Sequence, residues 1–483
     1  MLAILIGVVA IVVLTLGVQE RKRYRVLQDF AKQHGCKPAP SENPYDLFGI
    51  NKIISSTWHL LNKSTLQNTI DAFEKYGETY ASRIAAQRVF FTCSPRNIKH
   101  ILVQRFVDYD SSEVRAHLFR PITERGIFAV DGQQWRIARN LYRGQFSNTR
   151  SIVDLKMEEK HVKLILSCIP VGQSFDLQTL FLNLILDITT EFAIWDSVDS
   201  QSPTQTEEKN HFVSSLLTVK RVMARDGFLG PAAACHRFAE KRIATAIELR
   251  KLQQPPEKDG EERKPQGYSL LEGLTENSTN VIDLRDGATT ILVAGIDSVA
   301  SLLSTAFFLL GRNDKVFQKL RQSVLDAVGT EPPAFEQLKT LRVYPPVPFN
   351  ARTANKDTWL PTGGGPDGNS AVLVKKGQRV IFSSWAIHRS FQTFGDDAHD
   401  FRPDRWEHLT AESLLGYLPF NIGPRACPGQ QYALMEASYV AVRILQTFSA
   451  IKNCDPRPWT EHFGLNLSNE NGVQLELVRD EKT

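Results

Sequence analysis

The sequence predicts a mainly α-helical fold with small β-sheets, preceded by one transmembrane helix. Three observations lead to this fold class: an uncharged N-terminus of 18 residues, seven long segments with apolar residues at i, i+3 and i+4, and only short β-branched runs such as AVLVKKGQRVIF. The 483 residues are 42% hydrophobic and 23% charged, which are ordinary values for a globular protein. They exclude collagen-like, disordered and small disulfide-stapled chains.

The first element is the apolar stretch from Met1 to Val18. At about 1.5 Å per residue it reaches roughly 27 Å, close to the hydrocarbon thickness of the endoplasmic reticulum membrane. No basic residue precedes it, as a cleaved signal peptide would require, whereas four basic residues follow between Arg21 and Arg25. By the positive-inside rule we expect an uncleaved single-pass anchor in that membrane, with the rest of the chain cytosolic. The alternative, a buried core helix, is disfavoured because no polar face is visible.

We expect three parts: a transmembrane anchor over 1–18, a basic linker and pre-domain segment over 19–50, and a catalytic domain over 51–483. Six cysteines are scattered without CxxC spacing, which argues against a disulfide framework and a structural zinc site. The net charge of +4 is too small for a dedicated nucleic-acid-binding protein, which shows a clustered basic surface. We therefore expect reduced thiols and no nucleic-acid partner.

Seven segments are predicted to be helices: 133–146, 152–166, 177–192, 211–224, 237–252, 281–310 and 428–448. Between Gly287 and Gly311 the only charged residue is Asp297, so this segment could pass for a second transmembrane helix. Its several threonines and serines favour a long core helix with one functional face. Gln253 to Gly267, rich in proline and charge, predicts an exposed loop, and the glycines of Pro361 to Ser370 predict a turn before a hairpin.

The most informative stretch is Phe420 to Gly429, FNIGPRACPG, which a helical pattern follows at once. It fits FxxGxRxCxG at every defined position. A cysteine in a loop shaped by glycine and proline, just before a helix N-terminus, is exposed to backbone N–H groups and to the positive helix end. Both stabilise a thiolate, which can bind iron. The alternative is a buried, inert cysteine, which leaves the other fixed positions without a reason.

At this loop the chain resembles the cytochrome P450 family of haem-thiolate monooxygenases, and the resemblance runs from about Lys32 to the C-terminus. It implies a cytochrome P450 fold in which Cys427 is the axial ligand of the iron of haem b. It also implies that Phe420 packs beside the cysteine and that Arg425 meets a haem propionate.

The same resemblance implies further haem contacts. Trp135 and Arg139, four residues apart on one helix, would contact a propionate, as would Arg352. Gly423 and Gly429 would permit close approach to the macrocycle. Taken alone, a tryptophan and an arginine at this spacing are more often a surface stack.

The segment AGIDSVAS is similar to the family's oxygen-activation signature, A-G-x-[DE]-[TS], and maps onto Ala294, Gly295, Asp297 and Ser298. The chemistry needs a hydroxyl and a carboxylate that deliver protons near the oxygen, which makes Asp297 and Ser298 the expected catalytic residues. Serine stands where threonine is usual and lacks the methyl group that stiffens χ1, so we expect function with poorer coupling. The alternative is a serine hydroxyl that bonds back to the carbonyl four residues earlier.

One position departs from the family pattern. The Glu-x-x-Arg motif should precede YPP, and its arginine is Arg342, but Lys339 holds the place of the glutamate and the chain looks foreshortened there. Glu336 lies six residues from Arg342, on the opposite side of a helix. Arg342 and Arg405 would then lack the anion of a buried Glu–Arg–Arg triad, at a cost of about 3–5 kcal/mol. Either a misassigned or spliced transcript has lost residues, or the chain holds haem badly.

Four segments resemble fungal microsomal enzymes that hydroxylate alkanes and fatty acids at the chain end. The expected reaction inserts one oxygen atom from O2 into a C–H bond of such a lipophilic substrate. Electrons would come from NADPH through a separate cytochrome P450 reductase, because no flavin or nicotinamide motif is visible. The expected pocket residues are apolar: Ala294, Gly295, Val347, Phe349 and Leu465.

Two alternatives stay open. One is oxidation of a secondary metabolite, because fold does not fix substrate. The other is a degenerate, membrane-anchored protein without turnover, which the lysine at position 339 suggests. The histidines, His388 and His399 among them, lack metal-ligand spacing and are interpreted as surface or core residues.

Overall fold

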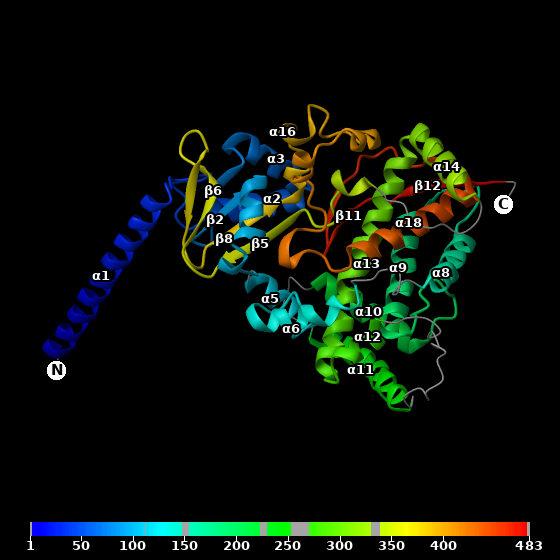
Figure 1. Ribbon diagram of the computed structural model, residues 1–483, viewed down its shortest axis with the longest axis horizontal. Coiled ribbons are helices and arrows are strands. Elements are labelled where there is room, and N and C mark those ends of the chain that lie inside the picture. The colour runs from blue at the N-terminus through cyan, green and yellow to red at the C-terminus, as the bar shows by residue number, and fades with distance from the viewer. Residues whose placement is uncertain are drawn as a thin grey trace. The chain divides into compact units, whose positions relative to one another are not determined.

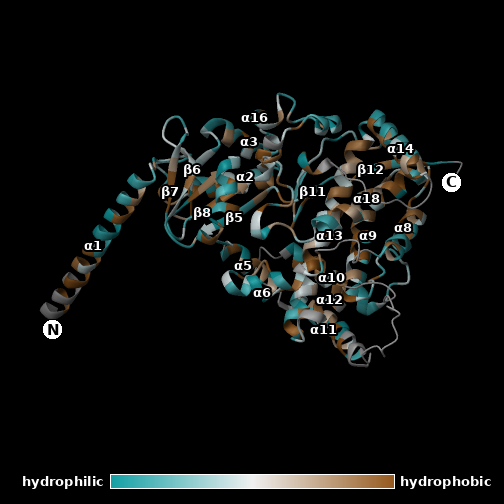
Figure 2. Cartoon of the chain, viewed as in Figure 1, coloured by the Kyte–Doolittle hydropathy of each residue, from teal (hydrophilic) through white to brown (hydrophobic). Residues whose placement is uncertain are grey.

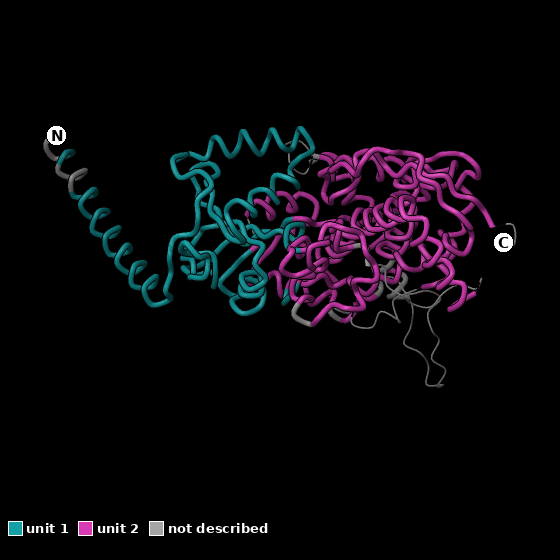
Figure 3. The backbone as a smooth tube through the Cα atoms, turned by 90° about the horizontal axis from the view of Figure 1, so that it is seen from above, with its two compact units in different colours: residues 1–110, 349–387, 422–424 teal, residues 111–348, 388–421, 425–483 magenta. Residues whose placement is uncertain are grey.

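The structure is a computed structural model that describes residues 2–111, 113–146, 154–222, 229–252, 270–329 and 339–480 (Figure 1). This part of the chain is mainly helical with four small β-sheets, which confirms the predicted secondary-structure class. It forms two compact units (Figure 3). Unit 1 comprises residues 1–110, 349–387 and 422–424, and unit 2 comprises residues 111–348, 388–421 and 425–483. The loop predicted over 253–267 lies outside the described residues.

Unit 1 is built on a five-stranded sheet in the order β1-β2-β8-β5-β3. Its strands are Thr79–Ile84, Gln87–Thr92, Arg379–Ser383, Phe349–Ala354 and Tyr109–Ser111 in that order. β1 and β2 form an antiparallel hairpin, β2 pairs with β8 in parallel, and β5 pairs with β8 antiparallel. A second hairpin, β6 (Thr358–Gly364) with β7 (Ser370–Val374), encloses the glycine-rich turn that the sequence predicts.

The helices of unit 1 are α1 (Leu2–Gln33), α2 (Ile50–Leu61), α3 (Thr65–Tyr76), α4 (Pro95–Lys99), a π-helix His100–Gln104, a 3-10 helix Phe106–Asp108 and α15 (Ser384–Ile387). The helix α1 continues without a break past Val18, and Figure 2 shows that it becomes hydrophilic toward Gln33. The boundary predicted after residue 18 is therefore not marked by a change in secondary structure.

Unit 2 is organised around α13 (Val281–Gly311), which packs along α9 (Leu177–Ile194). These two helices are long and apolar enough to cross a bilayer, but 72% and 67% of their apolar windows lie inside the protein; no other described helix, α1 included, meets that criterion. Asn280 caps α13 by accepting hydrogen bonds from the N–H groups of Ile282 and Asp283. The structure thus confirms a core helix where the sequence left a transmembrane helix open.

The other helices of unit 2 are α5 (Glu113–Phe119), α6 (Gly132–Arg143), α8 (Leu155–Cys168), α10 (Glu207–Val222), α11 (Leu229–Leu252), α12 (Leu270–Asn277), α14 (Asp314–Val328), α16 (Phe391–Phe394), α17 (Ala411–Leu414) and α18 (Gln430–Thr447). Its small sheets are β4-β12-β9 (Phe175–Asp176, Gln474–Arg479, Phe448–Asn453) and β10-β11 (Glu461–Phe463, Leu467–Asn469). All seven predicted helices are present. The largest shift is at α11, which begins at Leu229 instead of Arg237.

Two buried carboxyl groups face the interior between α8 and α18. Glu158 is 0% exposed and Glu436 is 2% exposed, and the Tyr432 hydroxyl donates to Glu158 Oε1 at 3.5 Å. Burial raises the pKa of Glu158 to about 8, and burial together with Glu158 raises the pKa of Glu436 further. Both groups therefore carry a proton at neutral pH.

This burial predicts a loss of stability as the pH rises from 4.5 to about 8. Between the ordinary glutamate pKa of 4.5 and about 8, folded Glu158 holds a proton that the unfolded chain has released, so stability is full below that window and falls as pH rises through it. Glu158→Gln should flatten the fall and raise the Tm at pH 8 by a few degrees, roughly the effect of 1–2 kcal/mol. Thermal unfolding followed by circular dichroism at several pH values measures this. The exposed control Glu407→Gln should track the parent chain, and parallel curves for all three proteins would contradict the assignment.

Candidate functional site

The cysteine loop leads into α18 and is closed by its own backbone. The N–H of Cys427 donates to the carbonyl of Phe420 at 2.9 Å. Gly423 has φ +75°, and a Cβ there would lie 2.1 Å from the carbonyl oxygen of Leu102, so only glycine fits. At Gly429 a Cβ would meet Phe146 at an ordinary 3.7 Å. The backbone therefore explains Gly423 and gives no equivalent reason for Gly429.

The surroundings of the Cys427 thiol act on its pKa in opposite directions. Its side chain is open to solvent, although protein atoms crowd the sulfur on its other sides. Burial raises the pKa of the thiol, and the N–H of Gly429 and the guanidinium of Arg139 lower it by less. The helix N-terminus and Arg139 thus act in the predicted direction, toward the thiolate, while burial acts against it. Full ionisation needs a further positive charge, such as a metal ion.

Cationic groups gather beside this loop. Arg139 on α6 donates from Nη2 to the carbonyl of Ala426 at 2.7 Å, and Arg425 forms an ion pair with Asp131. The Arg425 guanidinium lies 4.6 Å from the ring centroid of Trp135, which is 7% exposed. The structure therefore brings Trp135 and Arg139 to the cysteine loop, of which Arg425 is a part, and their contact with a haem propionate stays a prediction.

Arg115 on α5 is a further member that the sequence did not reveal. Burial and the nearby Arg425 lower the pKa of Arg115 to about 10, and Asp131 raises it by less. Together with the carboxylate of Asp131, the guanidinium groups of Arg115, Arg139 and Arg425 sum to a charge of about +2. Arg115 is 24 residues from Arg139 and belongs to no local pattern, so only tertiary structure could identify it.

Arg352 lies on β5 in unit 1 and is 2% exposed. Its Nη1 donates to Asn350 Oδ1 at 2.9 Å and to the carbonyl of Ala351 at 2.7 Å. Phe382 of the neighbouring strand lies beneath it, 5.8 Å from guanidinium carbon to ring centroid. The sheet thus fixes this predicted residue, which belongs to a different unit from the cysteine.

On α13, Asp297 has a partner that the sequence did not predict. Lys220 of α10 donates from Nζ to Asp297 Oδ1 at 2.5 Å, and the lysine is 8% exposed. The hydroxyl of Ser298 donates to the carbonyl of Ala294 at 2.8 Å and also contacts that of Gly295 at 3.2 Å. The bond back to the preceding turn, left open as an alternative for Ser298, is therefore present, while its oxygen can still accept a hydrogen bond.

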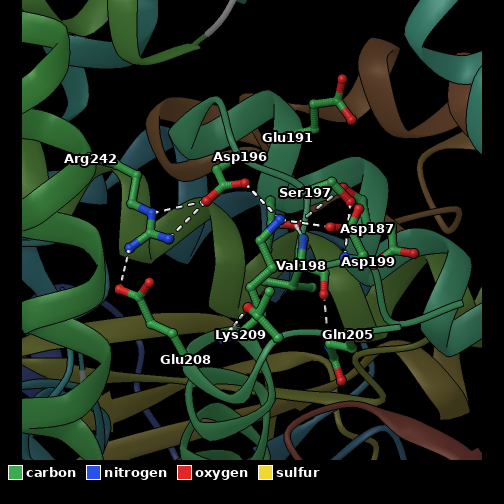
Figure 4. A network of polar contacts seen from close by, with 12 residues as sticks. Asp187, Glu191, Asp196, Ser197, Val198, Asp199, Gln205, Glu208, Lys209 and Arg242 are labelled. Atoms are coloured by element: carbon green, nitrogen blue, oxygen red, sulfur yellow. Dashed lines mark hydrogen bonds and ion pairs between the residues drawn. The ribbon is translucent and has the colours of Figure 1, made fainter. Parts of the chain in front are cut away.

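A network of ion pairs fixes the start of α10, the helix that carries this lysine (Figure 4). Lys209 Nζ lies 2.9 Å from Asp196 Oδ1 and 2.6 Å from Asp199 Oδ2, both in the turn after α9. Arg242 of α11 reaches Asp196 at 2.8 Å and Glu208 at 3.0 Å. The network ties α10 and α11 to the end of α9. It therefore limits the positions open to Lys220, the partner of Asp297 farther along α10.

Two hydrogen bonds bring separate segments to α13. The hydroxyl of Ser301 donates to the carbonyl of Leu467 at 2.5 Å, and the N–H of Leu467 donates to the carbonyl of Pro346 at 2.8 Å. The chain segments of two predicted pocket residues, Val347 and Leu465, therefore lie near α13, which carries Ala294 and Gly295.

The predicted pocket residues differ in exposure. Ala294, Gly295 and Leu465 are partly buried, while Val347 is 45% exposed. A Cβ on Gly295 would lie 3.5 Å from the Thr189 methyl group, so this glycine lets α9 approach α13. Phe349 begins β5 in unit 1.

Arg342 and Arg405 find acceptors without the missing glutamate. The Arg342 guanidinium donates to the carbonyls of His388, Ala398 and Asp400 at 2.7, 2.5 and 2.8 Å. Arg405 donates to the carbonyls of Phe394 and Asp397 at 2.5 and 2.7 Å and forms an ion pair with Asp397 Oδ1 at 2.6 Å. The expectation that both cations lack an anion is therefore wrong for Arg405.

The surroundings of Arg342 still carry an excess of positive charge. Burial and the neighbouring Arg405 lower the pKa of Arg342 to about 10. Lys339 begins the 3-10 helix Lys339–Arg342, and Glu336 lies outside the described residues. Satisfied hydrogen bonds thus replace part of what a carboxylate would supply.

Comparison with known proteins agrees with this geometry. A family model for cytochrome P450 matches residues 40–476. Cytochrome P450 monooxygenase fsdH of Fusarium heterosporum is 35% identical, over 94% of this chain and 85% of the relative. Cytochrome P450 monooxygenase himC of Aspergillus japonicus is 36% identical, over 94% and 87%. Cytochrome P450 52A3-A of Candida maltosa is 35% identical, over 88% of each chain.

Proposed function

The chain belongs to the cytochrome P450 family, and from that premise we propose that it hydroxylates a long-chain alkane or fatty acid. As a member it is a monooxygenase, an oxidoreductase that uses a thiolate-ligated haem iron and electrons from NAD(P)H passed on by a reductase. The single observation that carries the reaction class is the cysteine loop before α18. The substrate class and the role of each residue are our proposals.

The residues beside the loop fit a haem group. Cys427 is an exposed residue at the end of the loop, and its sulfur would take the iron. The local charge of about +2 from Arg115, Arg139, Arg425 and Asp131 is complementary to two propionate carboxylates. We assign Arg139, Arg425 and Trp135 to the propionates, Phe420, Gly423 and Gly429 to the loop that surrounds the iron ligand, and Arg352 to a further propionate contact.

When bound, the haem supplies the redox chemistry that activates O2, and protons must come from the protein. Lys220 holds the carboxylate of Asp297 in one position through a 2.5 Å ion pair. The ammonium group has three hydrogens, so it can keep this bond and still connect the carboxylate to water. The Ser298 hydroxyl, one residue along α13, can accept and donate at the same time. We propose that these three groups deliver protons and that Asp297 is the one that exchanges them.

Asp297→Asn tests this proton route. An amide keeps the size of the side chain but cannot release and regain a proton, so kcat should fall by about 10²-fold. More of the consumed NADPH should appear as hydrogen peroxide. Product, peroxide and NADPH measured in one reaction give this coupling. The exposed variant Asp314→Asn on α14 should match the parent chain, and unchanged coupling in Asp297→Asn would remove the carboxylate from the route.

The substrate proposal is supported by the resemblance to fungal alkane and fatty-acid hydroxylases and by the likeness to the Candida maltosa relative. The five proposed pocket residues, Ala294, Gly295, Val347, Phe349 and Leu465, carry no polar side chain that would orient a polar substrate. An apolar chain gains about 0.8 kcal/mol for each methylene removed from water, so affinity should grow with chain length.

A reduced, carbon-monoxide difference spectrum of membranes that hold the full chain tests the reaction class. We expect a thiolate-type Soret band, and its loss in Cys427→Ser. A series of alkanes and fatty acids, assayed with a cytochrome P450 reductase and NADPH, should then give hydroxylated products whose KM falls as the chain lengthens. If the thiolate-type band is present but only polycyclic metabolites are turned over, the proposal of an aliphatic substrate is wrong and oxidation of a secondary metabolite is supported. A missing band in the parent chain would support a protein that cannot hold its cofactor.

We further propose that the protein is anchored in the endoplasmic reticulum membrane by residues 1–18. A second apolar surface supports membrane contact. Over residues 45–61 of unit 1, large apolar side chains stand open to solvent, among them Phe48 at 66%, Ile54 at 62%, Trp58 at 57% and Leu61 at 74%. An exposed apolar group of this kind typically marks an interaction site, and a tryptophan suits the bilayer interface.

Deletion of residues 2–18 should separate the two contacts. The shortened chain should be released by carbonate yet stay on membranes at neutral pH, and adding Ile54→Glu with Trp58→Glu should move most of it to the soluble fraction. The control Leu414→Glu with Leu415→Glu alters two exposed leucines, 46% and 49% accessible, in unit 2. Sedimentation of washed membranes measures the distribution. Full retention after both changes would contradict membrane contact through residues 45–61.

A further inference from the structure

His388 is fully buried and makes two directional hydrogen bonds. Its Nδ1 lies 3.1 Å from the carbonyl oxygen of Arg342, and its Nε2 lies 2.8 Å from the backbone nitrogen of Leu418. A carbonyl only accepts and an amide N–H only donates, so Nδ1 carries the hydrogen and Nε2 offers its lone pair. The partners thus select one neutral tautomer.

The charges around the imidazole keep it in that form. Burial, then Arg389 and Arg342, lower the pKa of His388 to about 3. Tyr417 lies on another side, with ring centroids 5.4 Å apart. Protonation would place a third cation beside two buried guanidinium groups, so the ring stays neutral at any pH at which the enzyme works.

The two bonds of His388 connect the buried arginines to the cysteine loop. Its own carbonyl accepts from Arg342 Nη1 at 2.7 Å, so histidine and arginine hold each other at two points. Leu418 stands two residues before Phe420, whose carbonyl accepts from the N–H of Cys427 at 2.9 Å. Leu418 is 7% exposed, and without the imidazole its N–H would have to find another acceptor in a buried place.

We propose that His388 is the positioning residue that holds the loop around Cys427 in place for thiolate ligation. This rests on the proposed role of Cys427 as the iron ligand. With a lysine at position 339 in place of the family's glutamate, the bond from Nε2 to the N–H of Leu418 ties the arginine cluster to the start of the loop. Without that bond the loop would hold Cys427 less firmly in the position from which it would bind the iron of a haem.

Two substitutions of His388 separate the contributions of its two ring nitrogens, because each keeps only one of the two hydrogen bonds. In His388→Gln, the amide group occupies the position of Nε2 and can accept from the N–H of Leu418. In His388→Asn, it occupies the position of Nδ1 and can donate to the Arg342 carbonyl alone. The exposed His399, on the same segment of the chain, provides His399→Gln as the matched control.

The first readout is the ratio of thiolate-ligated to thiolate-free haem in the reduced, carbon-monoxide difference spectrum of membranes with each full-length variant. His388→Asn should lower this ratio by about tenfold, the shift expected when one buried donor is left unpaired, whereas His388→Gln and His399→Gln should stay near the parent. The second readout needs no haem. Hydrogen exchange of the Leu418 amide should speed up in the asparagine variant alone.

Equal ratios in the asparagine and glutamine variants, whether both normal or both low, would overturn the proposal, since the bond to Leu418 would then make no difference. Failure of both to fold would also overturn it, because the histidine would then serve the fold as a whole. A parent chain with no thiolate-type band would instead refute the role of Cys427, and the exchange of the Leu418 amide would still report on the histidine.

Discussion

A buried guanidinium gives up its bonds to water and needs acceptors in the protein, and this need organises the part of unit 2 that leads to the cysteine. Arg342 donates to three backbone carbonyls, and Arg405 donates to two carbonyls and the carboxylate of Asp397 while its Nε has no acceptor among the described residues. These carbonyls belong to the segment from 388 to 400, which has little regular secondary structure to satisfy them otherwise. The arginines and the segment therefore stabilise each other. The loop before α18 is joined to them by the hydrogen bond from the N–H of Leu418 to His388.

The residues of α13 for which we propose a role in proton delivery depend on a similar balance. A helix with 72% of its apolar window buried can hold Asp297 because Lys220 supplies the opposite charge at 2.5 Å. Breaking a buried pair by removing one partner costs about 3–5 kcal/mol, whereas the intact pair adds little net stability. Such a pair is explained better by a need for a charged group at that place than by a need for stability. This agrees with a role for the carboxylate in proton delivery.

The sequence reveals what is local. The cysteine loop, the seven helices and the W-x-x-x-R pair are patterns within one segment, and the structure places Trp135 and Arg139 beside the cysteine. Arg115, Lys220, Asp397 and the role of His388 could not be predicted, because each meets its partner through tertiary packing. The opposing effect of burial on the thiol pKa could not be predicted for the same reason, since burial depends on all surrounding segments.

When a motif residue is missing, its partners lose one hydrogen-bond acceptor but still need acceptors, and other groups of the protein can supply them. Lys339 replaces the expected glutamate, yet the hydrogen-bonding groups of Arg342 reach three carbonyls and Arg405 keeps a carboxylate. What the exchange leaves behind is a guanidinium whose pKa burial and the neighbouring Arg405 lower, while Asp397 and Asp400 raise it by less. Each buried donor left without an acceptor costs about 1–3 kcal/mol, and the three carbonyls spare Arg342 most of that cost. The missing glutamate is therefore an argument for a less stable enzyme and a weak argument for an inactive one.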